Sequence, residues 1–182
     1  RVIGSGSFGC VCEAWDEKHG AVTALKRIPN ALGTEEDARQ VLREIVALQR
    51  TSHPNVCTLR HAYFEASEEG AKKLDVQTMT LRPVSIDVYL SFEYAEGGDI
   101  HALRGQLSAK EVRGLMQQLA EATRYLHSVG IWHRDIKSAN TLIGKHRYGG
   151  RVIKLCDFGS ARGALGGPVE NPWEEEMGPK RR

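Results

Sequence analysis

The feature that most restricts what this 182-residue chain can fold into is the segment at residues 133–140, which reads H-R-D-I-K-S-A-N. It follows a stretch with the apolar periodicity of an amphipathic helix and precedes a short apolar run that is typical of a strand. Asp135 can accept a proton from a hydroxyl group, Lys137 can steady a phosphoryl group, and Asn140 can hold a metal ion. Seventeen residues after Asn140, the sequence D-F-G begins at Asp157, a second candidate metal ligand.

A glycine-rich segment lies near the start of the chain, where residues 4–11 read G-S-G-S-F-G-C-V. Glycines at this spacing let backbone N–H groups close over phosphate groups without interference from side chains. A dinucleotide-binding fold uses the same glycines, but there they open a helix and an acidic residue follows about 20 positions later. Here residues 10–15 and 21–26 alternate as two strands around a turn at 16–20, and the second strand ends on Lys26. This hairpin excludes a dinucleotide-dependent oxidoreductase.

The remaining segments predict two helices and several strands. Thr34 stands before three acidic residues as a helix cap, and apolar side chains recur at helical spacing from 38 to 50, with Glu44 at the edge of the apolar face. Ser108 caps a second helix at 109–128, which carries one apolar stripe. Residues 66–83 are polar and lack periodicity, so we expect a loop there. Strands are expected at 58–65, 86–94, 141–143 and 151–156.

The composition is ordinary for a soluble globular protein, with 41% hydrophobic and 26% charged residues. The net charge of +2 is too small to indicate nucleic acid or an acidic membrane as partner, and no run of eighteen apolar residues or leader segment is present. The four cysteines show neither a C-x-x-C pair nor a matching histidine spacing, so they indicate neither zinc nor a disulfide framework. Free thiols fit a reducing interior, and we expect a cytoplasmic or nuclear protein.

The glycine loop, Lys26 at the end of A-L-K, a helix acid, H-R-D-x-x-x-x-N and D-F-G occur in the order found in eukaryotic protein kinases, which this chain therefore resembles. The resemblance implies an α+β, protein-kinase-like two-lobe fold, with an antiparallel β N-lobe containing one main helix and an incomplete helical C-lobe. The expected boundaries are an N-lobe with hinge at 1–95, a partial C-lobe at 96–162 and an irregular or disordered tail at 163–182.

Four segments are similar to mitogen-activated protein kinases: A-L-K-R-I-P-N at 24–30, L-R-E-I at 42–45, D-V-Y-L at 87–90 and K-L-C-D-F-G at 154–159. Cyclin-dependent kinases, in the same larger group, come next. Lys137, two residues after Asp135, resembles serine/threonine kinases and not tyrosine kinases. Two departures from the group are the absence of proline from residues 137–140 and Ser160, which stands where leucine is usual.

The resemblance implies transfer of the ATP γ-phosphate to a protein Ser or Thr hydroxyl. Asp135 would orient the hydroxyl and accept its proton, while Lys137 would neutralise the γ-phosphate. Lys26 would contact the α- and β-phosphates and pair with Glu44. Asn140 and Asp157 would hold Mg²⁺. The residues expected around the nucleotide are Ile3, Gly4, Gly6, Gly9, Val11, Ala24, Lys26, Phe92 as gatekeeper, Glu93 and Ala95 through their backbone, and Leu142 under the adenine.

Two further expectations follow from the resemblance. Arg134, next to Asp135, suggests regulation by an upstream activating kinase, because a cation there can pair with a phosphate group. An apolar column linking the two lobes would contain Leu48, Leu59, His133 and Phe158.

The resemblance fades beyond residue 162, where no A-P-E motif and no T-x-Y phosphosite follow. We therefore expect an incomplete lower lobe, an exposed apolar patch along Leu115 and Leu119, and marginal stability. Two interpretations stay open: an active serine/threonine kinase, or a catalytically silent ATP-binding or regulatory fragment.

Overall fold

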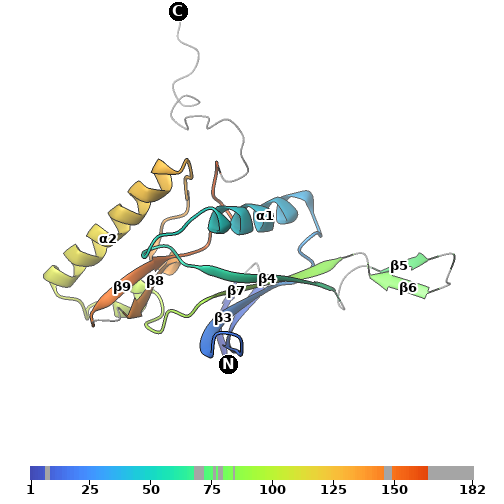
Figure 1. Ribbon diagram of the computed structural model, residues 1–182, viewed down its shortest axis with the longest axis horizontal. Helices are drawn as coiled ribbons and strands as arrows, with labels where there is room; N and C mark the ends of the chain where they lie inside the picture. Colours follow the sequence, from blue (N-terminus) through green and yellow to red (C-terminus); the bar gives the residue numbers. More distant parts are fainter. Residues whose placement is uncertain are drawn as a thin grey trace, which may run out of the picture.

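In the computed structural model, the described residues are 1–6, 9–67, 72–75, 77, 80–83, 85–145 and 149–163. They form an antiparallel sheet with a helix across one face, followed by a second helix that packs against a β-hairpin (Figure 1). The prediction of an α+β fold with an antiparallel N-terminal sheet is confirmed. The expected tail lies outside the described residues beyond residue 163.

The main sheet contains five strands in the order β1-β2-β3-β7-β4, and every neighbouring pair is antiparallel. The hairpin expected after the glycines is present, and it pairs Val11 with Lys26. Next to it, Ala24 pairs with Phe92. The strands are β1 (Val2–Gly6), β2 (Gly9–Asp16), β3 (Ala21–Ile28), β4 (Leu59–Ala66) and β7 (Ile86–Glu93).

Gly9 shows why the first turn of the sheet needs glycine. Its φ of 122° is a conformation that side chains disfavour, and a Cβ there would lie 1.9 Å from the carbonyl oxygen of Arg27. The backbones of β2 and β3 can therefore approach closely only because this position has no side chain.

Helix α1 (Glu35–Gln49) lies across one face of the sheet (Figure 1). The backbone N–H of Asp37 donates to the Thr34 hydroxyl over 3.1 Å, which satisfies an otherwise unpaired donor of the first turn. Three acidic residues in that turn complement the helix dipole. The buried side of α1 carries Val41 and Leu48, which join the core, and also Glu44.

The polar segment at 66–83 is not simply a loop, so that prediction was wrong in part. It contains a hairpin of β5 (Lys72–Asp75) and β6 (Thr80–Pro83) that extends beyond the end of the main sheet (Figure 1). In the described part of the chain, the two strands pair only with each other. Their pairing satisfies backbone groups, which needs no hydrophobic periodicity, and the periodicity therefore gave no signal.

The second half of the described chain is built around helix α2 (Ala109–Ser128), which has the bounds expected from its stripe. Ser108 and Glu111 form a reciprocal capping box at its start. Among the described residues, no helix combines the length and apolar character needed to cross a membrane. The other elements are η1 (Ile100–Leu103), η2 (Ser138–Asn140), β8 (Thr141–Lys145) and β9 (Arg151–Leu155).

One hydrophobic cluster joins the sheet, α1 and the second half of the chain. It contains Leu90 of β7, Leu126 of α2 and Phe158, all fully buried. The expected column lies in and around this cluster: Leu48 and His133 are buried, the His133 ring meets the Phe158 ring edge-on at 4.6 Å, and Leu59 packs against the cluster.

The expected exposed apolar patch on α2 was wrong for Leu115, which is only 3% exposed. Leu115 packs with Ile143 and Ile153 of the β8–β9 hairpin, and Leu119 packs partly against the same cluster. The hairpin covers this side of the helix, a contact between distant segments that the stripe alone could not reveal. The exposed large apolar side chains of α2 are Val112 and Met116.

A pair of substitutions on α2 tests which of its side chains support the core. We expect Leu126→Ala to lower the free energy of unfolding by about 3 kcal/mol, because it removes a fully buried side chain and leaves a cavity. Val112→Ala on the same helix should change it by less than about 0.5 kcal/mol. Urea denaturation measures both, and equal losses would contradict the assigned core.

Candidate active site

A cleft of about 800 Å³ lies between the main sheet and the second half of the chain. It brings together nine of the residues expected around a nucleotide: Ile3, Gly4, Val11, Ala24, Lys26, Phe92, Glu93, Ala95 and Leu142. Glu44 and Asp157 also line it. Gly6 and Gly9 belong to strands β1 and β2 but do not line this cleft, and the tip between them, Ser7 and Phe8, lies outside the described residues.

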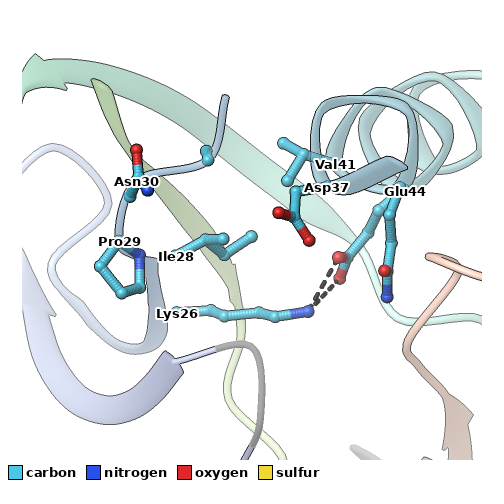
Figure 2. A pocket seen from close by; sticks show the side chains of 9 residues that line it. Lys26, Ile28, Pro29, Asn30, Asp37, Val41 and Glu44 are labelled. Carbon is cyan, nitrogen blue, oxygen red and sulfur yellow. Dashed lines mark hydrogen bonds and ion pairs between the residues drawn. The ribbon is translucent and has the colours of Figure 1, made fainter. Parts of the chain in front are cut away.

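Lys26 and Glu44 form a buried ion pair between β3 and α1 (Figure 2). The ammonium donates to both carboxylate oxygens, at 2.9 and 2.8 Å. Burial alone would lower the pKa of Lys26, but the Glu44 carboxylate and then Asp157 raise it above its usual value. Lys26 is therefore held as a cation at the wall of the cleft, with its position fixed by α1. A smaller pocket, of about 180 Å³, lies beside the pair between β3 and α1.

Strand β7 ends with Phe92 and Glu93, and the chain then enters the expected hinge. The Glu93 side chain is engaged within the protein, because it accepts from the backbone N–H of Thr58 and from Lys154. The Glu93 N–H donates to the Thr58 carbonyl, so any backbone contribution of Glu93 to a ligand would come from its carbonyl. The Glu93 side chain thus fixes the hinge to Thr58 and Lys154.

The far end of the hinge is fixed to β8. The N–H of Gly97 donates to the Ile143 carbonyl over 2.8 Å, and the Ile143 N–H donates to the Gly98 carbonyl over 2.7 Å. A Cβ at Gly97 would lie 2.8 Å from that Ile143 oxygen, so this close approach requires glycine. The connection between the two walls of the cleft is therefore anchored on both sides.

The acid, lysine and amide of residues 133–140 meet as a hydrogen-bonded cluster. The Asp135 carboxylate accepts from the Lys137 ammonium at 2.8 Å and from the Asn140 amide at 2.9 Å. The same amide donates to the Asp135 backbone carbonyl. The bond from Lys137, and after it the bond from Asn140, lower the pKa of Asp135 against the opposing effect of burial. Asp135 is an ionised carboxylate held in one orientation.

This cluster is tethered to the segment that follows β9. The buried His133 donates from Nε2 to the Cys156 carbonyl at 3.0 Å, while its Nδ1 accepts from the Asp135 N–H. Burial lowers the pKa of His133, so the ring is neutral and can accept at one nitrogen while donating at the other. Arg134, at a φ of 64°, donates to the Ser160 carbonyl. The loop thus keeps a fixed position relative to Asp157.

Asn140 and Asp157, the expected metal ligands, each carry a side-chain oxygen of the kind that binds a hard metal ion. The Asn140 NH₂ group donates to Asp135, which leaves its Oδ1 atom as the possible ligand. Asp157 lies in the cleft with a φ of 64°, and its charge acts on Lys26. An amide oxygen and a carboxylate are ligands that Mg²⁺ prefers. The residues present therefore fit a hard divalent cation.

Sequence reasoning overlooked several residues that line the cleft, Asp99 and Cys156 above all. Asp99 follows the Gly97–Gly98 turn, lines the cleft and caps η1 by accepting from the Ala102 N–H. A carboxylate there can accept bonds from ligand hydroxyl groups. Its sequence position, directly after the two glycines of the hinge, could have identified it. Cys156 directly precedes Asp157, and its sequence position alone could have identified it.

Comparison with known proteins agrees with this geometry. The protein kinase domain family matches residues 1–171. The chain is 32% identical over 168 residues to mitogen-activated protein kinase 10 of Oryza sativa subsp. japonica, covering 91% of this chain and 24% of that protein. It is 33% identical over 163 residues to mitogen-activated protein kinase 3 of Arabidopsis thaliana, covering 88% of this chain and 39% of that protein. The chain thus spans well under half the length of these relatives.

The Lys26–Glu44 pair can be tested through stability. Glu44→Gln leaves a buried ammonium without its countercharge, and we expect the free energy of unfolding to fall by about 3 kcal/mol. Replacing both residues, as Lys26→Met with Glu44→Leu, should recover most of this loss. Glu36→Gln, at the exposed end of the same helix, is the matched control. Urea denaturation is the measurement, and a Glu44→Gln loss no larger than the control's would contradict a buried pair.

Cys156 offers a test based on acidity. Burial, followed by the charge of Asp157, raises the pKa of its thiol to about 12, and the thiol donates to the Asn140 carbonyl. At pH 8 only about one thiol in ten thousand would then be a reactive thiolate. We expect iodoacetamide at pH 8 to leave the tryptic peptide Leu155–Arg162 unmodified in the native chain and to alkylate it in urea. Mass spectrometry measures the labelling, and equal labelling in both states would refute the raised pKa of the Cys156 thiol.

Proposed function

We propose, from the premise that this chain belongs to the protein kinase family, that it transfers the γ-phosphate of ATP to a protein Ser or Thr hydroxyl in the manner of mitogen-activated protein kinases. Protein kinases use ATP and a divalent metal. The observation that carries the proposal is the hydrogen-bonded cluster of Asp135, Lys137 and Asn140. Asp157 links this cluster to the buried Lys26–Glu44 pair, because it lines the cleft with that pair and its charge acts on both Lys26 and Lys137. We assign residues 1–95 to the N-lobe and hinge, 96–162 to the C-lobe portion and 163–182 to a tail.

Lys26 is proposed to bind the α- and β-phosphates. Its ammonium is charged, lies at the cleft wall and is oriented by Glu44, so it needs little reorganisation to meet an anion. Val11 and Ala24 on one side and Leu142 on the other would enclose the flat adenine ring, since all three line the cleft. Backbone groups of Glu93 and Ala95 would bond its edge, and Phe92 would limit the depth of the site.

Asp135 is proposed to orient the substrate hydroxyl and to take its proton as the phosphoryl group transfers. Its lowered pKa supports the charged form that this role requires. Lys137 is charged as well, because its bond to Asp135 raises its pKa, and it would neutralise the transferring group. The two side chains therefore present a negative acceptor and a positive clamp at adjacent points.

Asn140 Oδ1 and Asp157 are proposed to hold Mg²⁺ in the cleft. Bound there, the ion would neutralise charge on the phosphate oxygens. Asn140 also donates to Asp135, so the same side chain would fix the metal and the base relative to each other. The Asn140 amide group thus links the proposed metal site to Asp135 within one loop.

The proposal extends to regulation by an upstream kinase. Burial, and then the neighbouring charges of Arg162 and Arg43, lower the pKa of Arg134, so three guanidinium groups lie near one another. Like charges gathered in this way favour an anion such as a phosphorylated side chain. The protein substrate and the activating kinase are thus the proposed partners. The four free cysteines support action in a reducing compartment, the cytoplasm or nucleus.

The experiment combines phosphate transfer with nucleotide binding. Wild-type chain, Asp135→Asn and the exposed control Glu121→Gln are incubated with Mg²⁺ and radiolabelled ATP on a generic basic protein. We expect Asp135→Asn to lower transfer by about a hundredfold or more, because the acceptor is lost, while Glu121→Gln has no effect. In a parallel thermal-shift titration, Mg-ATP should stabilise all three chains.

Binding of Mg-ATP without transfer, unchanged by Asp135→Asn, would instead identify a catalytically silent nucleotide-binding fragment. Absence of any shift with Mg-ATP would contradict both functions.

A further inference from the structure

Three potential metal ligands gather away from the cleft, at the outer face of the main sheet. They are Asp16 at the end of β2, His19 in the β2–β3 turn and His61 in β4. His61 pairs with Ser91, and Ser91 pairs with Leu25. Adjacent strand residues point to opposite faces, so His61 lies on the face opposite Lys26 and the cleft.

The ligand atoms of these residues all lie within 4.8 Å of one another. Asp16 Oδ2 is 2.7 Å from His19 Nδ1, and the ring centroids of His19 and His61 are 5.5 Å apart. The Asp16 side chain is 9% exposed, whereas His19 is 45% exposed. The cluster thus has a nearly buried carboxylate at its base and an imidazole that can adjust at its rim.

A purely structural role accounts for part of this cluster. Asp16 accepts from the His19 backbone N–H at 3.1 Å as well as bonding the ring, which stabilises the turn of the hairpin. This explains Asp16 and His19, but it does not explain His61, which comes from a strand 42 positions after His19. Within the described residues the His61 ring has no hydrogen-bond partner, and the aromatic rings beside it are those of His19 and Tyr63.

We propose that Asp16, His19 and His61 bind a divalent transition-metal ion, with Zn²⁺ as the best match. Two imidazoles and one carboxylate form a common zinc ligand set, with water in the fourth position. Tetrahedral ligands at about 2.0–2.1 Å from zinc lie roughly 3.3 Å apart, so the cluster needs only a small adjustment of His19 and His61 to close around an ion. The metal would tie the β2–β3 turn to β4, independently of the reaction in the cleft.

Arg60 sets the electrostatic balance of this site. Its guanidinium lies 3.7 Å from the Asp16 carboxylate, and its buried Nη1 atom has no hydrogen-bond partner in the described part of the chain. A divalent cation on Asp16 would be repelled by this like charge. The geometry therefore predicts that removing the charge, in Arg60→Gln, tightens metal binding. A structural hydrogen-bond cluster would show no such gain.

The test is calorimetric titration of the 182-residue chain, carrying no polyhistidine tag, with ZnCl₂ alone under non-thiol reducing conditions. We expect one Zn²⁺ per chain, an affinity lowered by at least about tenfold in His19→Gln and in His61→Gln, and a higher affinity in Arg60→Gln. His101→Gln, at an exposed histidine of η1, is the matched control and should leave binding unchanged.

Two further readouts distinguish zinc bound at this site from zinc bound by thiolates or by scattered surface groups. Co²⁺ should give the visible bands of nitrogen and oxygen coordination without a thiolate charge-transfer band, which excludes Cys10 and Cys12 as ligands. Zn²⁺ should raise the melting temperature of the wild type by about 5 °C and leave that of His61→Gln unchanged. Urea denaturation without metal checks that each variant is folded.

Several results would overturn the proposal. The first is no Zn²⁺ binding by the folded wild type, and the second is wild-type affinity in His19→Gln and His61→Gln. A loss of affinity in His101→Gln as large as in these variants, or a cobalt–thiolate band, would also overturn it. Loss of phosphate transfer has no bearing on these outcomes, because none of them requires nucleotide.

Discussion

The position of Lys26 relative to α1 is the constraint on which the cleft depends, and the ion pair with Glu44 fixes it. Both charges are largely removed from water, which costs free energy unless each finds its partner. The helix must therefore keep one rotation and one height above β3 to satisfy the pair. Because Val41 and Leu48 flank Glu44 on the buried side of α1, hydrophobic packing and charge pairing select the same arrangement. Hydrophobic packing alone, or the ion pair alone, would hold the Lys26 ammonium less firmly.

The lower wall is held by a different kind of interaction, a set of backbone hydrogen bonds. Cys57 donates to the Leu155 carbonyl and Leu155 donates to the Asn55 carbonyl, which joins the segment before β4 to the end of β9. His133 and Arg134 then attach the loop with Asp135 to the backbone just beyond β9. The bonds between backbone groups do not depend on most side-chain identities. The loop at 133–140 is thus positioned by backbone bonds around β9 together with the side chains of His133 and Arg134.

Local rules predicted a large part of this fold. Caps and periodicity located α1 and α2, and the alternating pattern located the β2–β3 hairpin, because these elements are specified by neighbours in the sequence. Contacts between distant segments were not accessible in the same way. The burial of Leu115 depends on a hairpin some 30 to 40 residues later, and the β5–β6 pairing joins two short segments without apolar periodicity. His61 meets His19 only because β7 pairs with both β3 and β4. The roles of the cleft residues came from motif resemblance and stay predictions.

The two faces of the main sheet show how one strand can serve separate chemistries. Lys26 points into the cleft, while its neighbour Leu25 points to the outer face and pairs through Ser91 with His61. A metal joining the β2–β3 turn to β4 would restrict the outer face without adding a ligand to the cleft. Any influence on the reaction would then pass through the backbone of β3, as a change in how firmly Lys26 is held. Such an influence should alter nucleotide binding before it alters the chemistry at Asp135, because the proposed contact of Lys26 is with the nucleotide and that of Asp135 is with the hydroxyl.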